Sequence, residues 1–257
     1  MDDCMNLTYV CCFNNKTILE EMLMHSFANI DKAWNRNILL IDNTKGRYSS
    51  CAEAYNKELL NKSIGDILVF IHQDIAFENR EFEKRIVQEL TDNPNQILGF
   101  AGMTEQGIVV SNLRYLSTKE YITKRQIVEK TECIAVDECC FAMTADLYKQ
   151  LKFDEQVCFH WHLYATEICY NAHKQFGTRI CVIPEEIYHK KNGSDGLYTD
   201  MYYLRTLWRL ADKYRADLEE IRTPCYIVST HPIKFFLKIF RTFIRNHILK
   251  LCRRFLL

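Results

Sequence analysis

The chain has 257 residues, of which 48% are hydrophobic and 26% charged, so it can bury a core and is not an intrinsically disordered protein. The formal net charge is zero, but residues 231–257 hold seven Lys/Arg and no Asp/Glu, which leaves a net charge of −7 on residues 1–230. An acidic body of this kind does not favour nucleic acid as a partner.

Buried strands and amphipathic helices alternate along the first hundred residues. The apolar runs predict strands at 7–13, 37–41, 66–71 and 97–101, with helices between them at 17–27, 50–60 and 81–90. This alternation predicts a mostly parallel α/β sheet flanked by helices, in which ligands bind beyond the carboxyl ends of the strands. No strand is followed by GxGxxG or by a P-loop, so a dinucleotide enzyme or a P-loop NTPase is disfavoured.

The second half of the chain mixes strands and helices. We expect a hairpin with a charged loop at 107–134 and a strand with a short helix at 136–151. A helix at 159–176, a strand at 180–183 and a long helix at 198–221 complete the predicted elements. The sequence thus predicts one α/β domain over 1–230, followed by a tail.

Two residues after predicted strands suggest a metal site. Asp74 lies just past a buried strand, where a carboxylate can bind a divalent cation that neutralises a diphosphate. His189 follows the strand at 180–183, and an imidazole can complete such a site with Mn²⁺ or Mg²⁺. The alternatives are that Asp74 caps its own loop and that His189 is an ordinary loop histidine.

Two further groups carry acids near aromatic rings. Trp161 and Tyr164 can border an acceptor pocket, while Glu167 or His162 can accept a hydroxyl proton. Alternatively, Trp161 belongs to the core and Glu167 is a solvated helix residue. In the pair 137–138, Asp137 or Glu138 can meet an acceptor hydroxyl, unless both form loop salt bridges.

Taken in order, these segments resemble the GT-A fold of family 2-like glycosyltransferases. They are most similar to a subgroup that has His-Gln-Asp where most relatives have Asp-x-Asp. The matching segments are VCCFNN (10–15), ILLIDNT (38–44), SSCAEAYNKELL (49–60), GDILVFIHQDI (65–75), ILGFAGM (97–103), VDECCFAM (136–143), FDE (153–155), WHLYATEICYNAHKQFG (161–177) and CVIPEEIYHK (181–190).

The resemblance implies a nucleotide-sugar donor, a UDP-sugar first among them, and a single displacement with inversion at the sugar. The residues it assigns to the donor are Asn14, Asn15, Asp42, Asn43, Asp66, His72 and Gln73. It also implies that Asp74 and His189 bind the metal, and that the segment 161–167 borders the acceptor and supplies the base.

One position departs from the family pattern. Many family 2 enzymes have Glu-Asp near the start of the last helix, where this chain has Tyr164-Ala165, and the nearest acid is Glu167. We therefore expect Glu167, with His162 as the alternative, to be the base. The departure also leaves open a glycosyltransferase-like protein that binds sugar or membrane without catalysis. A nucleotidyltransferase of similar fold needs a Gly-rich, basic first loop, which residues 14–17 do not supply.

The tail at 231–257 has the pattern of a basic amphipathic helix. Its cations Lys234, Lys238, Arg241 and Arg245 share one face, and the later cations at 250–254 predict a bend near 246–247. Such helices lie on anionic membranes, which suits a lipid-linked glycan acceptor in surface polysaccharide synthesis. The alternatives are docking on the acidic body and a dimer contact.

The compartment is predicted from three features. The N-terminus is acidic rather than basic as in a signal peptide, the twelve cysteines lie in apolar runs without a CxxC pair, and no run reaches the ~18 apolar residues of a membrane span. We expect reduced cysteines and a cytoplasmic protein at the inner face of the plasma membrane.

Overall fold

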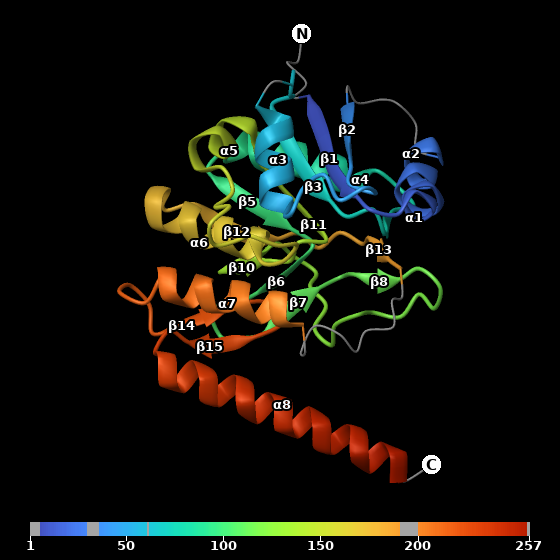
Figure 1. Ribbon diagram of the computed structural model, residues 1–257. Coiled ribbons are helices and arrows are strands. Elements are labelled where there is room, and N and C mark those ends of the chain that lie inside the picture. Colours follow the sequence, from blue (N-terminus) through green and yellow to red (C-terminus); the bar gives the residue numbers. More distant parts are fainter. Residues whose placement is uncertain (1–5, 30–35, 61, 191–199, 256–257) are drawn as a thin grey trace.

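The computed structural model describes residues 6–29, 36–60, 62–190 and 200–255. A mixed seven-stranded sheet forms its centre, in the order β2-β1-β3-β11-β5-β12-β9 (Figure 1). The strands are β1 Leu7–Phe13, β2 Arg36–Asp42, β3 Ile67–Ile71, β5 Gln96–Gly99, β9 Thr131–Cys133, β11 Cys140–Thr144 and β12 Arg179–Val182. The pairs β1–β2, β1–β3 and β5–β12 are parallel, whereas β11 and β9 run antiparallel to their neighbours. The expected α/β sheet is confirmed, with β11 and β9 making it mixed.

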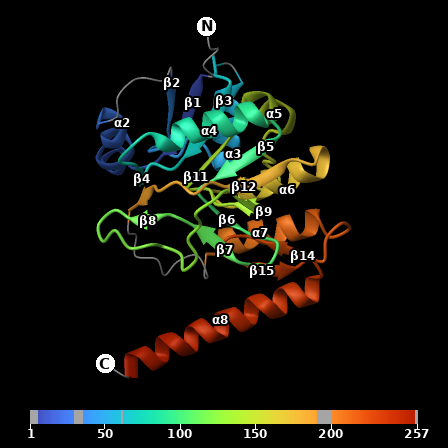
Figure 2. The ribbon, with the colours of Figure 1, turned by 180° about the vertical axis from the view of Figure 1, so that it is seen from behind.

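Helices cover both faces of this sheet (Figures 1 and 2). They are α1 Lys16–Leu19, the π-helical η1 Glu20–Met24, α2 His25–Asn29, α3 Cys51–Leu59, α4 Glu81–Asp92, α5 Ala145–Leu151 and α6 Tyr164–Phe176. Successive strand side chains point to opposite faces. Leu68 and Phe70 of β3 therefore join the core under α3, α5 and α6, whereas Ile67 and Val69 join the core under α2 and α4. Burial on both faces explains why β1 and β3 are continuous apolar runs.

Several predicted elements have different bounds in the structure. The strand expected at 97–101 divides into β5 and β6 Ala101–Met103. The helix expected from 159 begins only at Tyr164, because Leu163 has a left-handed backbone with φ of 66°. The helix expected at 198–221 is the shorter α7 Met201–Lys213, and the hairpin of β14 Glu220–Arg222 and β15 Ile227–Ser229 follows it.

Two small sheets lie beside the main one. One joins β10 Ala135–Val136, β6 and β7 Val109–Ser111. The other joins β4 Ile75–Ala76, β13 Tyr188–His189 and β8 Arg114–Tyr115. The second of these sheets matters for function, because it pairs a segment just after β3 with one more than a hundred residues later.

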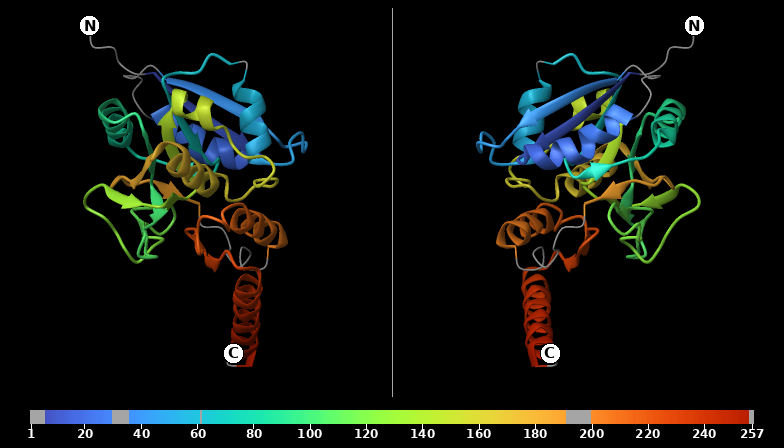
Figure 3. Two further views of the ribbon diagram at one scale, coloured as in Figure 1. Left: turned by 90° about the vertical axis from the view of Figure 1, so that its left-hand side faces the viewer. Right: turned by 90° about the vertical axis from the view of Figure 1, so that its right-hand side faces the viewer.

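The tail forms one helix, α8 Pro232–Phe255, so the bend expected near 246–247 is wrong. This helix lies outside α7 and the β14–β15 hairpin, at the end of the molecule away from the N-terminus (Figures 1 and 3). The predicted cations at 250, 253 and 254 lie outside the side chains that the structure describes. Within the described ranges, no helix is both long and apolar enough to cross a membrane.

Candidate active site

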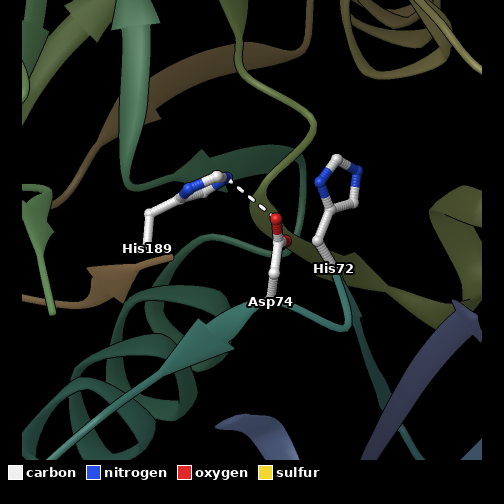
Figure 4. A group of neighbouring side chains, drawn as sticks. All are labelled: His72, Asp74 and His189. Atoms are coloured by element: carbon white, nitrogen blue, oxygen red, sulfur yellow. Dashed lines mark ion pairs between the residues drawn. The ribbon is translucent and has the colours of Figure 1, made fainter. Parts of the chain in front are cut away.

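Two strand ends bring His72, Asp74 and His189 together (Figure 4). His72 follows β3, Asp74 lies in the turn before β4, and His189 ends β13. β13 pairs antiparallel with β4, which places His189 opposite Ile75. The backbone N–H of Lys190 also donates to the carbonyl oxygen of Asp74 (3.0 Å). The grouping therefore results from strand pairing between distant segments.

The three side chains have the geometry of a metal site. One nitrogen or oxygen atom from each lies within 4.8 Å of the others, and His189 Nε2 is 3.5 Å from Asp74 Oδ2. His189 Nδ1 lies 2.7 Å from the carbonyl oxygen of Lys190, which can only accept, so Nδ1 carries the proton. When the ring is neutral, Nε2 presents its lone pair beside the Asp74 carboxylate, as in histidine ligands fixed by a second hydrogen bond.

His72 is held in this group by Tyr164. His72 Nε2 lies 3.0 Å from the Tyr164 hydroxyl oxygen. Burial lowers the pKa of His72, although the charges of Asp74 and Asp137 oppose this effect. The lowered pKa favours the neutral imidazole that a metal needs. The sequence assigned His72 to the donor, whereas the structure places it in the candidate metal group.

Gln73 ties two strand ends together at the same edge of the sheet. Its Oε1 accepts from the backbone N–H groups of Asn14 (3.1 Å) and Asn15 (2.9 Å), and its Nε2 donates to Asn14 Oδ1 (2.8 Å). Asn15 Oδ1 also accepts from the N–H of Ile18 and caps α1 (3.1 Å). These residues lie beside the candidate metal group, and their hydrogen bonds fix the end of β1 against the end of β3.

Asp42 and Asn43 have different roles at the end of β2. Asp42 is exposed, and its Oδ1 accepts from the N–H (2.8 Å) and the hydroxyl (2.6 Å) of Thr44, which lowers the pKa of the carboxyl. Asn43 is buried, and its side-chain amide bonds both the N–H and the carbonyl of Tyr48. Asp42 thus presents a negative charge to solvent, while Asn43 shapes the loop that follows.

Asp66 does not join this site. It precedes β3 and accepts from the N–H of Asn6 (2.9 Å), at the opposite end of the strand from His72. Six residues of extended chain separate the two, or about 20 Å. The assignment of Asp66 to the donor site is therefore wrong.

Glu138 and Tyr164 hold the residues around His72 in place. The Glu138 carboxylate accepts from the N–H of Leu163, the residue with the left-handed backbone, and burial raises the pKa of Glu138. Tyr164 is fully buried, with its hydroxyl on His72. Because Tyr164 is fully buried, it does not border an acceptor as predicted, whereas Glu138 is half-buried. Trp161 is half-buried against the same core, and Asp137 lies close enough to His72 to affect its pKa.

Glu167 cannot act as the base in this structure. Its side chain is 0% exposed, and its Oε1 forms an ion pair with Lys213 Nζ of α7 (2.6 Å). Burial raises the pKa of Glu167, while Lys213 lowers it. The neighbouring Ala165 faces the hydrophobic core. The expectation that Glu167 is the base is therefore corrected, because an acceptor cannot reach it.

His162 remains at the site and has a partner that the sequence did not reveal. Its Nε2 lies 3.4 Å from Asp200 Oδ2, at the start of α7. Burial lowers the pKa of His162, and the Asp200 charge raises it. His72 lowers the same pKa slightly, which indicates that the two imidazoles lie near each other. The only sequence signal for Asp200 was its place as a helix N-cap: its Oδ1 accepts from the N–H groups of Tyr202 and Tyr203.

The fold is that of GT-A glycosyltransferases. Similar solved structures include GalNAc-T7 with UDP, GalNAc and Mn²⁺, at a TM-score of 0.57 and 13% identity over 84% of this chain and 52% of that chain. The mannosyltransferase PcManGT from Pyrobaculum calidifontis with GDP-Man and Mn²⁺ has a TM-score of 0.56 and 14% identity, over 84% and 66% of the two chains. S. aureus TarS with UDP-GlcNAc has a TM-score of 0.52 and 12% identity, over 83% and 68%.

These identities establish the fold alone, and the chain spans only about half to two thirds of those proteins. The family comes from the sequence: residues 8–190 match the Glycosyltransferase like family, and the chain belongs to that family of family 2-like enzymes. The comparison with curated proteins finds no match.

Proposed function

We propose that the chain is a metal-dependent glycosyltransferase that moves a sugar from a nucleotide sugar to a glycan hydroxyl with inversion. The observation that carries this proposal is the convergence of His72, Asp74 and His189 where β1, β2 and β3 end. Among structures of this fold, GalNAc-T7 holds UDP with Mn²⁺ and TarS holds UDP-GlcNAc, so a UDP-sugar is the first donor to test.

The donor set favours Mn²⁺ over Mg²⁺. Two imidazoles and one carboxylate fit a cation that accepts nitrogen as well as oxygen ligands, whereas Mg²⁺ is bound almost wholly by oxygen. With three protein ligands, positions stay open for phosphate oxygens. When bound, the ion would neutralise the charge that develops on the nucleoside diphosphate as it leaves.

The chain's own groups supply the remaining steps. Asp42, ionised and exposed at the end of β2, accepts hydrogen bonds from the nucleoside. His162 is the base: Asp200 holds its Nε2–H, and its Nδ1 accepts the proton of the acceptor hydroxyl. The acceptor oxygen then bonds to the anomeric carbon from one face as the bond to the diphosphate breaks on the other, which inverts the configuration.

The acceptor that we propose is a glycan on a lipid carrier, in surface polysaccharide synthesis at the inner face of the plasma membrane. Trp161 and Asp137 border the space beside His162 and His72, and they offer a ring and a carboxylate to a sugar. The lipid carrier is proposed because α8 has the character of a membrane-surface helix.

The test compares Asp74→Asn with Asp66→Asn, two acids at opposite ends of β3. With a panel of nucleotide sugars, turnover should require Mn²⁺, be lower with Mg²⁺ and stop with chelator. Asp74→Asn should lower kcat/KM by about 100- to 1000-fold, because charge stabilisation of the leaving group is lost. Asp66→Asn should leave it nearly unchanged.

Equal turnover in Asp74→Asn and the unaltered protein would exclude this metal site. Binding of a nucleotide sugar without turnover over a broad acceptor panel would instead favour a protein that binds sugar without catalysis.

A further inference from the structure

The helix α8 has three kinds of side chain on three different faces. The exposed apolar side chains on the described part are Ile233, Phe236, Leu237, Phe240, Phe243 and Ile244. With about 100° per residue, they cover an arc of about 120°. The cations Lys234, Lys238, Arg241 and Arg245 cover a separate arc of about 60°. Phe235 and Ile239 lie on the third face.

The third face packs on the protein, and the ring of Phe236, at the border of the apolar face, also lies 5.0 Å from the ring of Trp208. Phe235 is 2% exposed, and its ring lies 5.0 Å from the ring of Trp208 on α7. Ile239 packs against the same core. By contrast, Leu237 is 48% exposed and Phe240 is 62% exposed. The first turns of α8 are thus fixed to the domain, while the middle of the apolar face points about 120° away from Phe235 and Ile239.

The cations of α8 are not used by the acidic body. Lys234, Lys238, Arg241 and Arg245 are all exposed, and among the described residues no ion pair joins them to a carboxylate. A helix docked on the body through its charges would show such pairs. The basic arc instead flanks the apolar arc. A surface with an apolar interior and a negatively charged outer layer would therefore contact both arcs at once.

We propose that α8 lies in the headgroup region of an anionic lipid bilayer, with the apolar face inserted and the four cations among the phosphates. Anionic phospholipid is the partner chemistry that matches both arcs. The Phe235–Trp208 contact then sets the orientation of the GT-A domain on the membrane. This inference stands apart from the transfer reaction, since binding needs no turnover.

The test is co-sedimentation of the full chain with vesicles. Unaltered protein should bind vesicles that contain phosphatidylglycerol and bind phosphatidylcholine alone only weakly. Lys238→Gln/Arg241→Gln should lower the partition coefficient on anionic vesicles by about 30-fold, because each cation near such a surface contributes about a factor of five. Leu237→Ser/Phe240→Ser, which leaves the contact with Trp208 in place, should lower it by about 100-fold on the same vesicles.

Two controls lie elsewhere on the surface. Val128 is 96% exposed, so Val128→Ser removes an exposed apolar side chain outside α8, and Lys149→Gln removes an exposed cation of α5. Both should bind vesicles like the unaltered protein. All variants should transfer sugar from a nucleotide sugar to a soluble acceptor at the same rate, which separates this proposal from the one on the catalytic site.

Two results would overturn the proposal. One is vesicle binding that both α8 variants leave unchanged. The other is absence of binding to anionic vesicles. If the chain is then a dimer in solution that Leu237→Ser/Phe240→Ser dissociates, the apolar face belongs to a second copy of the chain.

Discussion

Asp74 and Glu167 are two carboxylates in sequence segments that suggested chemistry, but the fold gives them opposite surroundings. Asp74 has two imidazoles beside it at the edge of the sheet. Glu167 forms an ion pair with the Lys213 ammonium group, within the contact between α6 and α7. Lys213 neutralises Glu167 within the protein, whereas we propose that Asp74 and its two imidazole neighbours hold a cation. The partner therefore decides whether a carboxylate serves binding or folding.

The largest effect that this comparison predicts is on stability. Lys213→Met removes the partner of a fully buried carboxylate, so the free energy of unfolding at neutral pH should fall by about 3 kcal/mol in urea titrations. Adding Glu167→Gln to the same chain should recover most of this loss, because the buried charge is gone.

The pH dependence has a definite sign. Lys213 lowers the pKa of Glu167 against burial, so its removal raises that pKa further above the ordinary value of 4.5. A raised acid pKa costs stability only above its unfolded value, so the deficit of Lys213→Met should shrink as the pH falls towards 4.5. If Glu167→Gln instead lost turnover without losing stability, Glu167 would be the base after all.

A smaller effect should appear on the other side of the comparison, at the support of the metal group. Tyr164→Phe removes the hydroxyl that bonds His72 Nε2 and keeps the ring in the core. Losing such an outer contact weakens metal sites, so the affinity for Mn²⁺ should fall about 10-fold in titrations followed by thermal shift.

Tyr148→Phe is the matched control. It removes a hydroxyl bond to Asn56 Oδ1 (3.0 Å) from a buried tyrosine of α5, away from the metal group. It should not change the affinity for Mn²⁺. Equal affinity in Tyr164→Phe and the unaltered chain would mean that His72 is not a ligand.

The sequence predicted those parts of the molecule that depend on local pattern. The apolar runs of β1 and β3 are visible within ten residues, and the structure confirms them. The placement of Asp74 at a strand end followed from the same pattern. The structure places His72 and Asp74 beside His189, so these two segments are neighbours.

What failed depends on contacts between distant segments. β4 and β13 have two residues each, too few for any periodicity, yet their pairing sets His189 beside Asp74. Glu167 was predicted to be the base, or else a solvated helix residue, because its partner Lys213 lies on another helix and could not be seen from the local pattern. Asp66 was assigned by alignment, and only the direction of β3 shows that it lies at the far edge.

The last prediction concerns the pair that replaces Glu167 as the base. Asp200→Asn keeps an N-cap on α7, since asparagine caps as well as aspartate, but removes the charge beside His162. Asp200 raises the pKa of His162, so its loss should lower that pKa and move the acid limb of the kcat/KM profile to lower pH. The plateau should fall by only about 10-fold, because a weaker and less oriented base remains. Asp212→Asn, an exposed acid on the same helix, should leave the profile in place. An acid limb that stays fixed, or moves to higher pH, in Asp200→Asn would show that His162 does not accept the proton.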